Sequence, residues 1–445
     1  MNTSHEIAIE EEQINNEQEI DPGIMQKLPG ILRTLGTGVL LIAMYSFLIK
    51  GWQSGNDVIR YLMMLGHTGV LAAIGLASGH WLKDGKGARL LFALALVSVP
   101  ANFAILGAFI FSQTGEVDIS FYPNYAAWSV ESLTAAIATS AGAMLILIPV
   151  IMLGFTVLAR SVSKKLSMLF LFSNAALLIP LRDPQLVAAL VVALISMSIF
   201  FSSRASHENI AIRTREGITA IGLQFLPLTV LMVRSLWLYS ADDFLLTVLA
   251  ATVFFMIRQA SFYLEPGSKW RNTLDGVSVL PSLAIIPFLG ETLTGTTLVA
   301  ESLVIPITTL ASAGMIYDIS KRSQNSAAVY RNIAVVIVLL STVFNLFAFS
   351  GLLAALSCIA IGAGLLVLGY QNQYRNVFSS GATLSSLGLL HQAYELVHHF
   401  HLGSWASMAV LGIVAILLAA TIESQASKLK SSIKHWSSTY KNWES

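Results

Sequence analysis

The feature that most constrains this chain is a series of apolar stretches, each close to the length needed to cross a lipid bilayer. The hydrocarbon core is about 30 Å thick, and an α-helix crosses it with about 20 apolar residues. We count about fourteen such stretches joined by short connections. They lie at roughly 31–49, 61–82, 88–111, 132–158, 166–180, 185–202, 216–238, 243–264, 276–290, 297–317, 331–350, 352–369, 377–397 and 404–422.

The stretches are expected to be helices, because backbone groups in lipid must be satisfied within their own segment and the alternation of a barrel strand is missing. Composition agrees: 11% of the residues are charged and 55% hydrophobic, and the mean hydropathy is +0.69. A soluble fold carries about a quarter charged residues. We therefore predict an all-α fold, a polytopic transmembrane helix bundle over residues 28–423.

The basic residues predict the orientation of the bundle. With the N-terminus inside, every second connection and both tails are cytoplasmic, and they carry Lys and Arg in roughly a five-to-one excess over the outer side. The predicted outer side has only Lys50, Arg60, Arg182 and Arg234. The longest outer connection, 112–131, is acidic and aromatic. We expect both termini in the cytoplasm.

The two ends of the chain have different predicted roles. Residues 1–27 are polar and acidic and lack the features of a secretory signal, so they are expected to form a disordered cytoplasmic tail. In 424–445, Leu429, Ile433, Trp436, Tyr440 and Trp443 recur at helical spacing beside several lysines. This pattern predicts a basic amphipathic helix on the cytoplasmic leaflet, with a frayed extension of the last helix as the alternative.

Several classes of function are excluded or unsupported. The formal net charge is +1, and no basic patch interleaved with aromatic residues indicates a nucleic-acid partner. The single cysteine, Cys358, cannot form a disulfide within the chain. The sequence lacks a nucleotide-binding glycine loop, a nucleophile elbow, a zinc-protease pair and a haem-attachment motif, and no cofactor is expected. The expected partners are the lipid bilayer and a small-molecule or lipid substrate.

Ionisable residues at membrane depth are costly and are therefore functional candidates. Under the predicted topology, five of them fall in the outer halves of their helices: His67, Arg234, Glu301, His391 and Glu395. They could line an outward-opening polar cavity in which Arg234 pairs with Glu301 or Glu395. The alternative is a set of separate interfacial residues that never meet.

A second candidate region is 276–306. It holds Pro281, Pro287 and Pro306 together with Glu291 and Glu301. Interrupted helices often surround the binding site of a transporter, because freed backbone groups face the substrate. Kinks absorbed by neighbouring helices are the other interpretation.

A third cluster lies near residue 395. His391, Glu395 and His398 share one helical stripe, and His399 and His401 follow. Imidazole and carboxylate at this spacing can share a divalent metal or relay a proton. A water-facing histidine cluster at a helix end is the competing interpretation.

Two stretches resemble known families. In the connection 79–89, Asp84, Gly87 and Arg89 match part of the loop motif of major-facilitator transporters, whereas Gly85 and Ala88 replace two of its basic residues. Over about 31–113, Gly36-Thr37-Gly38, Gly51-Trp52, Gly87-Ala88-Arg89 and Val99-Pro100-Ala101-Asn102-Phe103-Ala104-Ile105-Leu106-Gly107 resemble the start of uncharacterised bacterial multi-pass membrane proteins. The second resemblance implies a bacterial inner membrane and no particular activity.

The sequence favours a secondary transporter or flippase-like permease of unknown substrate, since buried helices, short loops and proline-broken segments suit that role. One alternative is a non-transporting scaffold or subunit, because small-residue patches such as Gly362-Ala363-Gly364 and 135–143 suit helix packing. Another is an intramembrane enzyme acting on a lipid-linked substrate, with His391 and Glu395 as acid and base.

Overall fold

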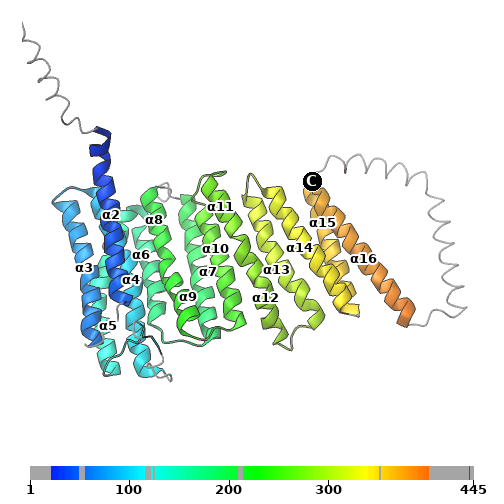
Figure 1. The fold of residues 1–445 in the computed structure, drawn as a ribbon, viewed down its shortest axis with the longest axis horizontal. Coiled ribbons are helices and arrows are strands. Elements are labelled where there is room, and N and C mark those ends of the chain that lie inside the picture. The colour runs from blue at the N-terminus through cyan, green and yellow to red at the C-terminus, as the bar shows by residue number, and fades with distance from the viewer. Residues whose placement is uncertain are drawn as a thin grey trace, which may run out of the picture. The chain divides into compact units, whose positions relative to one another are not determined.

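The structure is a computed structural model that describes residues 22–49, 56–115, 122–123, 126–208, 214–349, 352–399 and 440. The described residues are helical and form no β-strand (Figure 1). They divide into two compact units, Met1–Ser240 and Ala241–Ser445. The predicted all-α fold is therefore confirmed.

Unit 1 contains eight α-helices and one short 3-10 helix in its described residues. They are α2 (Pro22–Ile49), α3 (Asp57–His80), α4 (Gly85–Thr114), α5 (Leu133–Leu158), the 3-10 helix η2 (Arg160–Val162), α6 (Ser163–Leu178), α7 (Pro184–Glu208), α8 (Arg215–Gln224) and α9 (Leu226–Leu238). α2 begins at Pro22, so the last residues of the predicted acidic tail are helical.

The described part of unit 2 contains seven α-helices. They are α10 (Asp243–Ser261), α11 (Lys269–Val277), α12 (Val279–Thr294), α13 (Glu301–Arg322), α14 (Ala327–Ala348), α15 (Leu352–Asn372) and α16 (Arg375–His399). The predicted crossing at 404–422 lies outside the described residues, as does the predicted helix 424–445 except for Tyr440. The Tyr440 hydroxyl donates to the carbonyl of Arg375 at 3.3 Å.

In the part of the chain that the structure describes, ten helical segments are long and apolar enough to cross a membrane. They are Lys27–Met44, α3, α4, α5, α8 with α9, α10, α11 with α12, α13, α14 and α15. α7 adds a shorter apolar stretch, Pro184–Phe200. Many large hydrophobic side chains on these helices are exposed to the surroundings, as a membrane protein requires, since lipid covers them. The chain is a multi-pass membrane protein.

Polar residues set the helix boundaries within each unit. The Asn56 side chain accepts from the amide of Val58 at the start of α3, and Ser132 does the same for Ala135 in α5. Such caps satisfy amides that have no partner inside the helix. Several consecutive helices of one unit pack side by side, as α3 does with α4, α4 with α5, and α13 with α14.

α4 is the central helix of unit 1, where it packs against α3, α5 and α6. Phe92, Phe103 and Phe109 of α4 are fully buried. A polar contact lies inside this core: the Asn102 amide donates to the Thr68 hydroxyl at 2.9 Å. In lipid such bonds hold neighbouring helices together, because an unpaired polar group has no water to bind.

α15 and α16 of unit 2 approach each other closely through glycines. A Cβ atom added at Gly362 would collide with the backbone of Ser385, and one added at Gly369 would collide with Phe378. Gly362, the first residue of the small-residue patch Gly362-Ala363-Gly364, therefore packs against another helix of the same chain.

Candidate functional site

The strongest candidate site is built around Arg234, near the end of α9 in unit 1. The Arg234 side chain is 9% exposed, and its Nη1 donates to the carbonyl of Leu177 at 3.2 Å. Leu177 belongs to the last turn of α6, where carbonyls lack helical partners and carry partial negative charge. Nε of Arg234 is buried and has no hydrogen-bond partner among the described residues.

A second arginine, Arg182, lies in the connection between α6 and α7. Its guanidinium stacks over the rings of Phe111 (4.3 Å) and Tyr239 (4.7 Å). The Tyr122 ring meets the Tyr239 ring edge-on at 5.7 Å. Burial lowers the pKa of Arg182, although Tyr239, as a hydrogen-bond partner, and Tyr122 oppose this shift. We call Arg182, Arg234, Phe111, Tyr122 and Tyr239 the arginine cluster.

The arginine cluster holds two cations without a carboxylate partner. Among the ion pairs of the described residues, none includes Arg182 or Arg234. The nearest carboxylate in sequence, Asp183, caps α7 by accepting from the amides of Gln185 and Leu186 at 3.0 Å. The two arginines are also close enough to repel each other. A concentration of buried positive charge results.

Local sequence explains the geometry of the cluster. α6 ends after Leu178 because Pro180 follows, and the short helix leaves its last carbonyls facing α9. Gly107 lets α4 lie against the same part of α6, because a Cβ atom at this position would collide with the Leu177 carbonyl oxygen. α9 is separated from α8 by a break at Phe225, with Pro227 in its first turn.

The sequence prediction named Arg234 but missed the rest of the arginine cluster. Arg182 was predicted only as an outer basic residue, and Tyr122 lies in the connection 112–131, which was described only as acidic and aromatic. Two sequence features could have indicated the cluster: the short apolar stretch 166–180, which forms α6, and the prolines on both sides of Arg182. Sequence spacing alone could not indicate that four separate segments place these side chains together.

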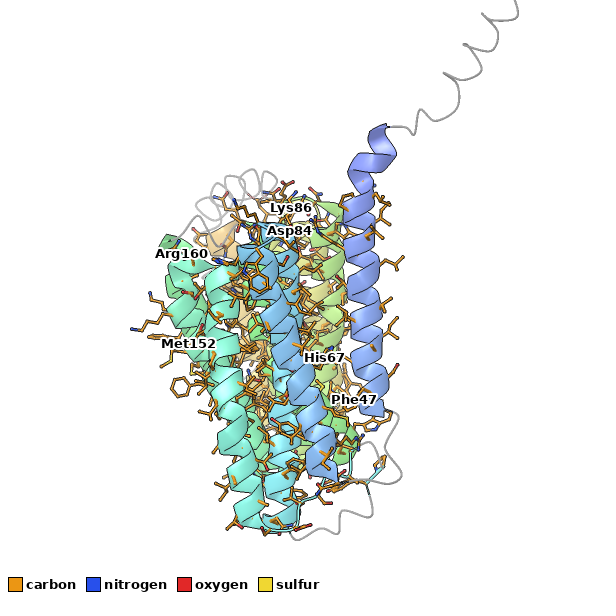
Figure 2. All side chains as sticks on the ribbon, turned by 90° about the vertical axis from the view of Figure 1, so that its left-hand side faces the viewer. Phe47, His67, Asp84, Lys86, Met152 and Arg160 are labelled. Carbon is orange, nitrogen blue, oxygen red and sulfur yellow. The ribbon has the colours of Figure 1, made fainter. Side chains whose placement is uncertain are left out.

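His67 lies on α3, away from the basic end of unit 1. Figure 2 shows Lys86 and Arg160 at one end of the helices, Phe47 of α2 toward the other, and His67 between them. Both ring nitrogens of His67 are buried and unbonded within the described part of the chain. His67 is thus not bonded to Arg234, and α3 packs mainly against α4 and α5.

The predicted acidic residues lie in unit 2. Glu291, on α12, and Glu301, in the first turn of α13, are both exposed. Glu395 lies on α16, and nothing of its side chain is described. The predicted pairing of Arg234 with Glu301 or Glu395 joins residues of different units and stays a prediction.

The predicted histidine and metal cluster stays untested. His391 is half-buried on α16, the side chain of His398 is not described, and His401 lies outside the described residues. Among the described residues, no group of three histidine, cysteine, aspartate or glutamate side chains is placed to hold a metal ion.

Region 276–306 is interrupted, as its prolines predicted. α11 and α12 are separated by a break at Ser278, and Pro287 and Pro306 lie inside α12 and α13. Just before the break lies Asp275, which is 1% exposed. The sequence analysis did not single out this buried carboxylate.

Asp275 belongs to an ion-pair network in unit 2. Asp318 of α13 accepts from Arg258 Nε at 2.9 Å and lies 3.0 Å from Arg322 Nε. Arg322 in turn lies 3.7 Å from Asp275 and donates to the Ser261 hydroxyl. We call Arg258, Asp275, Asp318 and Arg322 the α13 network. It joins α10, α11 and α13.

Unit 2 also contains an apolar cavity of about 160 Å³ between α13, α14, α15 and α16. Its lining includes Gly314, Tyr317, Val338 and Tyr374, and Arg331 stacks over the Tyr374 ring at 3.8 Å. An apolar chain suits this lining better than a polar solute does. None of the predicted site residues lines the cavity.

The connection that resembles the major-facilitator loop makes ion pairs to other helices of unit 1. Asp84, labelled in Figure 2, caps α4 and accepts from Arg33 of α2 at 2.9 Å. Arg89 donates to Glu216 of α8 at 2.5 Å. Asp84 and Arg89 therefore tie helices together at one end of the unit.

No protein-family model, no curated protein and no solved structure matches this chain. Its function must therefore be argued from its own residues.

Proposed function

We propose that this protein is a secondary transporter or flippase-like permease of a bacterial inner membrane, with about fourteen crossings and both termini in the cytoplasm. The bias of Lys and Arg toward alternate connections supports this orientation. Within unit 1, Lys86 and Arg160 share one end of the helices, as two cytoplasmic connections should (Figure 2).

The observation that carries the proposal is the arginine cluster. A charged residue inside a membrane protein costs several kcal/mol unless it is paired, and such residues mark substrate or ion pathways. Arg234 is buried in a segment long enough to span the membrane, and it lacks an ion-pair partner among the described residues. A scaffold that only packs against partners does not need this charge.

The division of the chain agrees with a permease. The boundary after Ser240 separates the first seven predicted crossings from the last seven. Many transporters are built from two halves, with discontinuous helices near the substrate. Each unit here contains a broken spanning segment, α8 with α9 and α11 with α12.

Transport is tested on purified protein in proteoliposomes. Vesicles with the wild-type chain, the Arg234→Ala variant or no protein are exposed to a soluble metabolite extract, and their contents are compared by mass spectrometry. Lipid movement is followed separately with a fluorescent phosphatidylglycerol and an external quencher. In one of the two assays, we expect the wild-type chain to move more metabolite or lipid than empty vesicles do. The Arg234→Ala variant should lose this difference. No gain in either assay would refute the proposal.

The orientation is tested with reporter fusions. A reporter in 203–215 should be cytoplasmic and one in 112–131 should be external. The same compartment for both would show that the number of crossings is wrong.

A further inference from the structure

The arginine cluster has an electrostatic imbalance that its own residues do not remove. Removing a guanidinium from water costs several kcal/mol, and a second cation nearby adds repulsion. The Leu177 carbonyl and the aromatic rings offset part of this cost for Arg234 and Arg182. They contribute partial charges only, so net positive charge remains.

The unused donors of the cluster are fixed in place. Arg182 is held by two rings and by the Leu181 carbonyl, to which its Nη1 donates at 2.9 Å. Its Nε and Nη2, together with Nε of Arg234, are buried and have no hydrogen-bond partner among the described residues. Three buried donors on two rigid guanidinium groups suit an acceptor with several oxygens and more than one negative charge.

We infer that the arginine cluster binds a phosphate group, carried either by a lipid headgroup or by a soluble solute. The inference rests on the proposed permease function, because it names the class of substrate that the same site would bind. Binding can nevertheless be measured without transport. A phosphate matches the donors because its oxygens accept from both guanidinium groups at once.

The competing occupant is a carboxylate of the chain itself. Glu116 and Asp118 of the acidic outer connection lie outside the described residues and are the nearest candidates in sequence to Tyr122. The double variant Glu116→Gln, Asp118→Asn separates the two explanations. With a phosphate ligand, the double variant should bind as the wild-type chain does.

The experiment measures the thermal unfolding midpoint of the full chain in phosphatidylcholine nanodiscs. Inorganic phosphate is titrated against chloride at equal ionic strength, and a second set of discs contains phosphatidylglycerol. A ligand that binds the folded state raises the midpoint with its concentration. Arg182→Gln and Arg234→Gln are compared with Arg60→Gln, which removes a buried arginine that has a nearby carboxylate, Asp57.

We expect phosphate, phosphatidylglycerol or both to raise the wild-type midpoint, and the arm that responds identifies the source. Losing one guanidinium should raise the dissociation constant about tenfold to a hundredfold, while Arg60→Gln keeps wild-type affinity. If Arg234→Gln does not fold, Arg182→Gln decides, because Arg182 lies in a connection and is only half-buried.

Three results would overturn the inference: no response to either ligand, an equal loss of affinity in Arg60→Gln, or a response seen only in the Glu116→Gln, Asp118→Asn variant. Phosphate binding without transport would keep the inference and remove the proposed function. Transport by the wild-type chain without any response to phosphate or phosphatidylglycerol would keep the proposed function and remove the inference.

Discussion

Replacement of Asp318 by asparagine tests whether the α13 network stabilises unit 2. The Asp318 carboxylate is the partner of both Arg258 and Arg322. Asparagine keeps the size of the side chain and removes its charge. Arg322 then keeps Asp275, at 3.7 Å, as its remaining carboxylate, and Arg258 loses its ion pair with Asp318.

The size of the effect follows from the exposure of each pair. Arg258 and Asp318 are each about one-third exposed (31% and 33%), so solvent screening limits their pair to about 1 kcal/mol. Arg322 is 7% exposed, and a hydrogen bond to a charged group there contributes about 1.5–3 kcal/mol. The expected loss is about 2–4 kcal/mol, which lowers the midpoint by about 4–16 °C for a unit of this size.

The assay is thermal unfolding in nanodiscs, with Asp243→Asn as the matched control. Asp243 is an exposed carboxylate in the first turn of α10, and no ion pair of the described residues includes it. We expect its variant to lose at most about 1 kcal/mol. A double-mutant cycle with Arg258→Gln isolates the direct pair, which should couple by at most about 1 kcal/mol.

Equal midpoints for Asp318→Asn and Asp243→Asn would refute this reasoning, because the network would then contribute no more than a solvated charge. A large loss in Asp318→Asn without coupling to Arg258 would assign the effect to Arg322 alone.

Two further predictions concern unit 1. Gly107→Ala should lower its unfolding midpoint, because the added Cβ would collide with a backbone carbonyl of α6, whereas Gly142→Ala, which meets open space, should not. The Gly87 amide, followed by the Arg33 guanidinium, holds the pKa of Asp84 below its ordinary value of 3.8. The contact between α2 and α4 should therefore persist above pH 3.8 and weaken as the pH falls through the lowered pKa. Hydrogen exchange of α2 should show this change, and Asp84→Asn should remove it.

The fold was predictable from sequence because the bilayer imposes one simple rule. An apolar stretch long enough to cross the bilayer is expected to be a helix. The first thirteen predicted stretches coincide with helices in the described residues. Breaks inside these helices were harder to predict. Pro281 indicated the interruption near Ser278, whereas Pro287 and Pro306 lie inside unbroken helices. The break at Phe225 was missed although Pro227 follows it.

The candidate site was only partly predictable, because sequence shows where a charge lies along a helix and not which neighbour it meets. Arg258 bonds to Asp318, sixty positions away, and no pattern in the sequence links these two residues. Arg234 was expected to pair with a glutamate, and in the structure it donates to a backbone carbonyl of α6. Backbone partners leave no signal in residue types.

Three arginines lie at one end of unit 1 and differ in whether a carboxylate of the described residues lies beside them. Arg60 is 4% exposed, lies 4.0 Å from Asp57 and stacks over Trp128 at 4.0 Å. Arg182 and Arg234 lie at the same end of α4, where Phe109 meets Trp128 and Phe111 meets Arg182. If water satisfied every arginine at this end, a carboxylate beside Arg60 would bring little benefit. The contrast fits the proposed phosphate ligand, which would supply the anion that Arg182 and Arg234 lack among the described residues.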